Sequence, residues 1–273
     1  MLGCTAPACN NRLFLHPSSD PLPTSAERVE IETTHRRLDG RPIEGFYREY
    51  GVEERPGVFV LAFTGNAGRA ERLLDVLPQE LSPWREQGMA VLAINYPGFG
   101  SMPDPGPATL RRLGVAAEEA YAYAVKRAAG APVVVYGISM GTTAALHIAA
   151  SDSEQPPAAL VLDRGPNIPR IVMGRFGWWN LWLAAGPVTL SLPRSVWSRG
   201  NARRIDDVPA LFVLGNQDTL VTPRNGGSVI AKYDAPHRVV HLDIGHNSRV
   251  IADQHPEFVE GLAWLWAQVE AAP

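Results

Sequence analysis

Short, almost uninterrupted apolar runs recur along the chain, and longer amphipathic segments separate them. The apolar runs cover residues 58–63, 90–94, 133–136, 159–162, 210–214 and 239–242. Such short runs are typical of strands buried on both faces, as in a parallel sheet. The segments of helical length and period cover residues 70–87, 108–129, 142–150, 224–233 and 256–270. Because strands and helices alternate, the pattern predicts a doubly wound α/β domain with a mostly parallel central sheet and helices on both faces.

An antiparallel ribbon is expected before this alternation begins. Residues 29–34 and 43–50 have the composition of strands, and Asp39-Gly40 lies between them. A dipeptide of this kind tolerates the positive φ of a tight hairpin turn. We therefore place the folded domain at 28–273 and interpret residues 1–27 as an N-terminal arm, since one domain with an insertion suits a chain of 273 residues.

Residues 168–207 break the alternation, because they lie between two sheet strands and add no further strand. We interpret them as a helical lid inserted over the C-terminal edge of the sheet. Four of the seven tryptophans fall in this segment: Trp178, Trp179, Trp182 and Trp197. Trp178, Trp179 and Trp182 are candidates for an apolar roof over a bound substrate, although aromatic clusters more often pack a lid onto its core.

Composition and charge exclude several classes of function. The formal net charge is −3 and no run of Lys and Arg occurs, so the sequence offers no patch for nucleic acid or an anionic bilayer. Charged residues or prolines interrupt every apolar stretch before it reaches the ~18 residues of a membrane-spanning helix. No His-Glu-x-x-His motif, G-x-G-x-x-G motif or P-loop lysine is present, so we expect neither a metal nor another cofactor.

Two cysteines, Cys4 and Cys9, lie in the N-terminal arm, so neither suits a catalytic nucleophile or a four-ligand metal site. Two interpretations of the arm stay open. Met1-Leu2-Gly3-Cys4 is similar to the end of a bacterial lipoprotein signal, which would give an exported form anchored by a lipid on Cys4. Without such a signal, the arm is a polar extension and the cytoplasm suits the chain.

The strongest chemical signal is the segment 137–141, which reads Gly-Ile-Ser-Met-Gly between an apolar strand and an Ala-rich helix. This is the nucleophile-elbow pattern, in which Ser139 is raised above the sheet on a sharp turn. Such a turn crowds the backbone on both sides, so Gly137 and Gly141 are expected because neither has a side chain. The alternative is a serine that caps an ordinary helix after a glycine turn.

With these residues the chain resembles the α/β-hydrolase superfamily, over roughly residues 28–270. It is most similar to a branch of small esterase-like proteins that carry His-Gly-Asn-Ala-Gly after the third strand. The corresponding segment here, 63–68, reads Phe-Thr-Gly-Asn-Ala-Gly, and the segment 95–101, Asn-Tyr-Pro-Gly-Phe-Gly-Ser, matches another turn of that branch. Thr64 replaces the usual histidine. The resemblance implies an oxyanion hole formed by the backbone N–H groups of Asn66 and Met140.

The same resemblance implies a triad in the chain order serine, acid, histidine. Asp218 follows the run 210–214 in a Gly-x-x-Asp-x-x-Val-x-Pro motif, where the superfamily usually has its acid. Asp163, at the end of the preceding strand, is the main competitor. His246 follows the last apolar run within a Gly-His segment, and it is the one histidine of seven on a loop at the expected place.

We therefore expect a serine hydrolase that cleaves a small-molecule carboxylic ester, with an apolar acyl or aryl group, through Ser139, Asp218 and His246. Two alternatives remain open from the sequence. An amidase or peptidase would use the same triad and the same tetrahedral intermediate. A non-catalytic member of the fold would keep the pocket and only bind a ligand. The oligomeric state is not determined by the sequence.

Overall fold

The computed structural model describes residues 15–175, 186 and 188–271. Within these residues, one eight-stranded sheet has the strand order β1-β2-β4-β3-β5-β6-β7-β8. Strand β2 is antiparallel to both β1 and β4, and every other neighbouring pair is parallel. The strands are β1 Glu27–Ile31, β2 Ile43–Tyr50, β3 Val58–Phe63, β4 Met89–Ile94, β5 Val133–Ile138, β6 Ala159–Asp163, β7 Ala210–Gly215 and β8 His237–Leu242.

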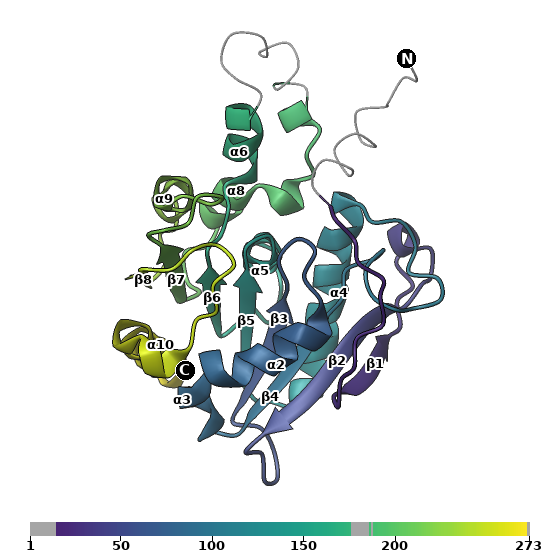
Figure 1. Ribbon diagram of the computed structural model, residues 1–273. Helices are drawn as coiled ribbons and strands as arrows, with labels where there is room; N and C mark the ends of the chain where they lie inside the picture. The colour runs from purple at the N-terminus through teal and green to yellow at the C-terminus, as the bar shows by residue number, and fades with distance from the viewer. Residues whose placement is uncertain (1–14, 176–185, 187, 272–273) are drawn as a thin grey trace.

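Helices cover both faces of this sheet (Figure 1). The α-helices of the described residues are α2 Ala70–Glu80, α3 Ser82–Arg85, α4 Leu110–Ala128, α5 Gly141–Ala149, α6 Ile168–Arg175, α8 Ser198–Ala202, α9 Pro223–Ile230 and α10 Pro256–Glu270. Short 3-10 helices cover Arg36–Leu38, Arg194–Val196 and Ala252–Gln254. None of the described helices is both long and apolar enough to cross a bilayer.

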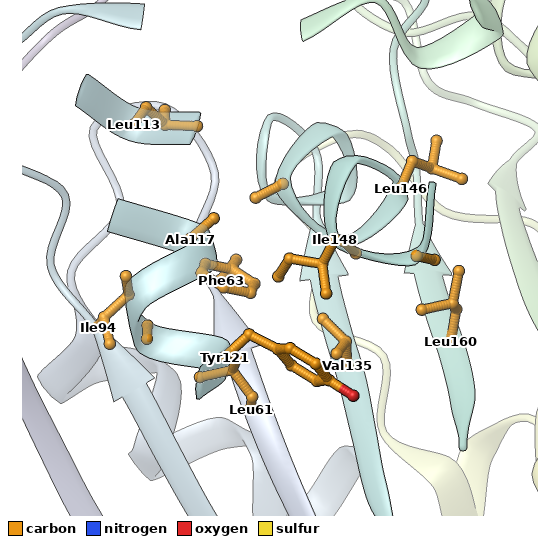
Figure 2. Close-up of a cluster of buried hydrophobic side chains, with 14 of the residues drawn as sticks. Leu61, Phe63, Ile94, Leu113, Ala117, Tyr121, Val135, Leu146, Ile148 and Leu160 are labelled. Carbon is orange, nitrogen blue, oxygen red and sulfur yellow. The ribbon is translucent and has the colours of Figure 1, made fainter. Parts of the chain in front are cut away.

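Two apolar cores lie on opposite faces of the sheet, because successive side chains of a strand point to opposite sides. On β3, Phe59, Leu61 and Phe63 face the core formed with α4 and α5, whereas the alternate positions of the strand face the core formed with α2 and α10. Figure 2 shows the first core, with Leu61 and Phe63 of the sheet close to Tyr121 of α4 and Ile148 of α5. All six residues of β3 are fully buried. The two-sided burial of the central strands is why they appear as continuous apolar runs in the sequence.

The predicted mixed α/β architecture is confirmed, and two elements differ from expectation. The segment 70–87 forms two helices rather than one, because the chain leaves helical geometry at Leu81 and Pro83 stands in the first turn of α3. The run 239–242 was expected to be buried on both faces, which is wrong for β8. This strand lies at the sheet edge, with Val240 and Leu242 buried and Val239 and His241 exposed.

The N-terminal ribbon pairs as expected but turns differently. Ile31 lies opposite Ile43 in the antiparallel register, so β1 ends earlier than the predicted strand 29–34. The connection holds the 3-10 helix Arg36–Leu38, followed by Asp39 at φ 56° and Gly40 at φ 69°. The positive φ expected at this dipeptide is present, but it ends a longer loop rather than forming a two-residue hairpin turn.

Of the residues between β6 and β7 that the structure describes, α6 and α8 stand above the carboxyl ends of the strands (Figure 1). Trp178, Trp179 and Trp182 lie outside the described residues, so their predicted contact with substrate stays a prediction. Trp197 is described, is half-buried, and donates its indole N–H to the carbonyl of Leu192 at 3.2 Å. Cys4 likewise lies outside the described residues, and its lipidation stays a prediction.

Candidate active site

Ser139 stands on the turn between the end of β5 and the start of α5, with a backbone φ of 51°. A positive φ is unfavourable for a residue with a side chain, so surrounding contacts must hold it. One such contact is a hydrogen bond from the Ser139 N–H to the carbonyl of Asp163 on the neighbouring strand, at 2.8 Å. The turn therefore lifts the serine hydroxyl out of the sheet at the base of a cleft.

The two elbow glycines stand where the backbone approaches most closely. A Cβ atom on Gly137 would lie 2.5 Å from the carbonyl oxygen of Gly141, and one on Gly141 would lie 2.2 Å from that of Phe63. Both distances are well inside van der Waals contact with backbone that cannot move aside. The steric argument for small residues two before and two after Ser139 therefore agrees with the geometry.

A chain of hydrogen bonds joins the three residues predicted as a triad. The Oγ atom of Ser139 lies 2.9 Å from Nε2 of His246, and Nδ1 of His246 lies 2.6 Å from Oδ2 of Asp218. His246 is on the loop after β8, and Asp218 is on the loop after β7. With Asp218 accepting from Nδ1–H, Nε2 is left as the acceptor for the serine proton.

Asp218 is 3% exposed, and its other carboxylate oxygen is also occupied. Oδ1 accepts hydrogen bonds from the backbone N–H groups of Leu220 at 2.9 Å and Val221 at 2.7 Å. These bonds fix the carboxylate in rotation, so that Oδ2 points at the imidazole. An oriented, buried carboxylate is the group that holds a catalytic histidine in one tautomer and stabilises its charged form.

Asp163, the competing acid, has a different partner. It forms a two-point ion pair with the guanidinium of Arg164, with Oδ1 2.8 Å from Nε and Oδ2 2.5 Å from Nη2. Both side chains are almost completely buried. No described histidine bonds to Asp163, so the geometry favours Asp218 as the partner of the base.

Arg164 is a residue that the sequence interpretation missed. Its Nη1 donates to the carbonyl of Gly245 at 2.9 Å and to that of Ser248 at 2.6 Å, so one guanidinium holds the loop on both sides of His246. Burial acts to lower the pKa of Arg164, but the charge and hydrogen bonds of Asp163, with smaller contributions from Tyr136 and Glu80, raise the pKa on balance. Its backbone φ is 51°, a second positive-φ residue beside the elbow. A sequence signal is absent because the contacts join residues more than 80 positions apart.

A further carboxyl group, that of Glu80 at the end of α2, contacts the loop that follows β8. It accepts a hydrogen bond from the hydroxyl of Tyr136 at 2.7 Å and one from the N–H of Val250 at 3.4 Å. Burial, and secondarily the negative charge of Asp163, raise the pKa of Glu80 to about 7. The loop that carries His246 therefore contacts a buried carboxyl group whose pKa is near neutral pH.

The loop 65–68 lies beside the elbow. A Cβ on Gly65 would lie 3.3 Å from Cβ of Ser139, so the loop backbone reaches the serine directly. The N–H groups of Asn66 and Met140, the predicted oxyanion donors, have no acceptor among the described residues. Both residues line the cleft. Two unpaired backbone donors beside a serine are what an oxyanion hole requires.

Thr64 stands where the similar branch has histidine. It is buried, and its hydroxyl has no hydrogen-bond partner among the described residues. The loop is held instead through the backbone, because the hydroxyl of Tyr96 donates to the Thr64 carbonyl at 3.0 Å. The side chain of Asn66 is also engaged, accepting from the N–H of His16 at 3.0 Å. The substitution thus leaves the backbone donors of the loop in place.

The cleft has a volume of about 780 Å³, and its lining includes Ser139, His246 and the loop 65–68. Ile168 and Ile171 of α6, together with Leu220, supply apolar wall. This volume lies within the range of small-molecule sites, about 300–1,000 Å³. Among the described residues, no group of three or more His, Cys, Asp or Glu could hold a metal ion.

Comparison with solved structures gives several enzymes with the same fold. An acetyl xylan esterase from Paenibacillus sp. R4 is 20% identical, with a TM-score of 0.62 over 96% of this chain and 92% of that one. Est1E from Butyrivibrio proteoclasticus is 15% identical, with a TM-score of 0.66 over 90% of this chain and 100% of that one. The esterase Pf2001 from Pyrococcus furiosus is 15% identical, with a TM-score of 0.62 over 94% and 96%. No family model and no curated protein matches the chain.

Proposed function

We propose that this chain, which has the α/β-hydrolase fold, is a serine hydrolase that cleaves carboxylic esters of small molecules. The observation that carries the proposal is the unbroken hydrogen-bond chain from Asp218 through His246 to Ser139, at 2.6 and 2.9 Å. The hydroxyl of serine is a weak nucleophile unless a neighbouring base removes its proton. The arrangement supplies such a base, together with the carboxylate that orients it.

In the first step, the Oγ atom of Ser139 attacks the ester carbonyl carbon while Nε2 of His246 takes the hydroxyl proton. The negative charge that develops on the carbonyl oxygen is stabilised by the N–H groups of Asn66 and Met140; one such donor typically contributes about 3 to 4 kcal/mol. The imidazolium of His246, stabilised by Asp218, then returns its proton to the departing alkoxide. The products of this step are an alcohol and an ester between the acyl group and Ser139.

In the second step, water attacks the acyl-enzyme and His246 acts again as the base. Its proton then passes back to Oγ of Ser139, which releases the carboxylic acid. Net consumption is one ester and one water, and no cofactor takes part. The enzyme returns to its starting protonation state.

An ester is favoured over other acyl compounds because the structural neighbours named above are esterases. The apolar wall of Ile168, Ile171 and Leu220 favours an apolar acyl or aryl group. An amide would pass through the same intermediate, so matched ester and amide substrates separate the two reactions. A ligand-binding protein without hydrolytic activity is a third outcome, and it would give no turnover with either.

The test is turnover of a p-nitrophenyl ester series of increasing acyl length by wild type, Ser139→Ala and His246→Ala. We expect hydrolysis by the wild type and its loss in both variants. The matched control is Ser151→Ala, because Ser151 follows the far end of α5 and its hydroxyl donates only to the carbonyl of Ile148. Unchanged hydrolysis in Ser139→Ala, or none by the wild type, would contradict the proposal.

A further inference from the structure

A second hollow, of about 650 Å³, lies between α6, α8 and the end of α9, outside the catalytic cleft. We call it the cationic groove. Positively charged side chains reach it from all three segments, which are far apart in the sequence. Its lining includes Arg170 and Met173 of α6, Trp197, Arg199 and Arg203 at α8, and Lys232 after α9.

The charge of this groove is not balanced by acidic groups. No carboxylate lines it within the described residues. The sequence has no Asp or Glu from residue 164 to residue 205, and none in the residues outside the described ranges. In this part of the chain, seven arginines are therefore interspersed with neutral residues only, although the whole chain has a net charge of −3.

Several arginines elsewhere in the described chain pair with carboxylates. Examples are Arg28 with Glu44, Arg112 with Asp39, and Arg127 with Glu27, each at 3.0 Å. Within the described residues, no ion pair involves any of the four groove cations. The guanidinium of Arg170 instead donates a long hydrogen bond, 3.4 Å, to the backbone carbonyl of Arg224.

The gathered like charges repel one another, although solvent and salt weaken this repulsion because Arg170, Arg199 and Arg203 are exposed. Arg199 and Arg203 are four residues apart, a spacing that places like charges side by side and destabilises a helix. Arg170 and Lys232 add two further charges from other segments. A bound anion with several oxygen atoms would remove this repulsion, because guanidinium groups bind phosphate through paired N–H donors.

The groove also has an apolar wall. Trp197 and Met173 line it, and Met173 is exposed to solvent although it is a large apolar residue. An inorganic ion would leave this surface in water, whereas a ligand with an apolar group would cover it. We propose that the cationic groove binds a phosphate-bearing amphiphile, with the phosphate on the four cations and its apolar group against Trp197 and Met173.

This site is separate from the cleft, although α6 borders both. Ile168 and Ile171 of α6 line the cleft, while Arg170 and Met173 line the groove. Binding at the groove therefore requires neither Ser139 nor hydrolysis. Failure of the groove proposal would leave the proposed esterase activity untouched, and the reverse also holds.

Hexyl phosphate is a suitable probe, because it has the phosphate and the apolar group but no carboxylic ester. We expect isothermal titration calorimetry to show binding to the full chain that weakens as salt rises. The double variant Arg199→Gln/Arg203→Gln should weaken it by about tenfold or more, since two of the four cations are removed. The matched control is Arg204→Gln, because Arg204 is adjacent in sequence but lies outside the groove lining, near Asp152 at 3.9 Å.

Inorganic phosphate and hexanol test the two halves of the ligand, and each should bind more weakly than hexyl phosphate. The proposal is overturned if wild type does not bind hexyl phosphate at millimolar concentration. It is also overturned if the double variant binds hexyl phosphate as tightly as wild type does, or if Arg204→Gln weakens binding as much as the double variant does. Binding of inorganic phosphate or hexanol as tight as that of hexyl phosphate would overturn it as well. Unchanged ester hydrolysis by the double variant checks that it is folded.

Vesicles identify the source of the phosphate group. Cosedimentation with phosphatidylglycerol vesicles, lost in the double variant and absent with pure phosphatidylcholine, would assign the groove to a lipid headgroup. Binding of hexyl phosphate without cosedimentation would assign it to a soluble phosphorylated compound. Either result supports the phosphate site. Vesicle binding that the double variant retains would show that another surface holds the membrane.

Discussion

Two buried aspartates lie near the carboxyl ends of neighbouring strands and have different partners: Asp163 is the last residue of β6, and Asp218 is on the loop after β7. Asp163 is 2% exposed and forms a two-point ion pair with Arg164. Asp218 is 3% exposed and bonds to a histidine that in turn contacts a serine. Both side chains are therefore almost completely buried at the same edge of the sheet. The partner therefore separates the two: in the proposed mechanism the carboxylate of Asp218 orients the base, whereas that of Asp163 neutralises Arg164, which bonds to the loop of His246.

The largest effect is expected for Asp218→Asn. The amide keeps the size of the side chain but removes the negative charge and favours the wrong histidine tautomer, so kcat should fall by about 10⁴-fold. The midpoint temperature of thermal unfolding should change little, because the amide oxygen of the new side chain can still accept hydrogen bonds from the N–H groups of Leu220 and Val221. Steady-state ester hydrolysis, with circular dichroism for folding, checks this. An equal loss of kcat in Asp163→Asn would remove the distinction between the two aspartates.

Asp163→Asn should act mainly on stability. It leaves the guanidinium of Arg164 buried without its counter-charge, and breaking a buried pair in this way typically costs about 3 to 5 kcal/mol. Urea unfolding of the variant measures this change. Asp163→Leu/Arg164→Met serves as the comparison, because removing both charges costs less than leaving one of them unpaired. A double variant less stable than Asp163→Asn would contradict the ion-pair account.

Glu80→Gln should change the pH dependence of stability. The pKa of Glu80 is about 7 in the folded chain and 4.5 as its ordinary value, so the folded state binds more protons between these values. The stabilising contribution of Glu80 to the free energy of unfolding is therefore fully present below pH 4.5, and it is lost as the pH rises through 7. Glutamine resembles the protonated carboxyl group in shape and charge. Above pH 7 the free energy of unfolding of the variant should therefore exceed that of wild type by up to about 3 kcal/mol. Urea unfolding at pH 5 and pH 8 tests this, and an equal difference at both would contradict it.

Arg164→Met should lower kcat by roughly 10²-fold, because small displacements of a catalytic group have effects of that order. The variant loses the bonds to the carbonyls of Gly245 and Ser248 that hold the loop of His246. KM should change little, because Arg164 does not line the cleft. Arg164→Lys is the comparison, since one ammonium can restore part of the contact. Equal kcat in wild type and Arg164→Met would show that the loop keeps its position without the arginine.

The parts of the site that the sequence predicted are those set by short-range sterics. Gly137, Ser139 and Gly141 form one five-residue turn, and the buried strands around it appear as apolar runs because both of their faces are covered. Strand β8 shows the limit of that signal: its apolar residues resemble those of a central strand, yet it lies at the edge. Whether a strand has a second neighbour is a property of the whole sheet.

Long-range electrostatics could not be predicted in the same way. Arg164 follows Asp163 directly, but its bonds to Gly245 and Ser248 depend on how β6 and the last loop meet. The groove cations likewise never form a run in the sequence, and only folding gathers them from three segments. A chain without a basic run can therefore still carry a basic surface.

The central claim is that Ser139 is a nucleophile activated through His246. The most direct measurement is labelling with a fluorophosphonate, followed by mass spectrometry of the labelled peptide. The account predicts one phosphonylated residue, Ser139, with labelling slowed strongly in His246→Ala and unaffected in Ser151→Ala. Labelling at another serine, or no labelling of folded wild-type protein, would contradict it.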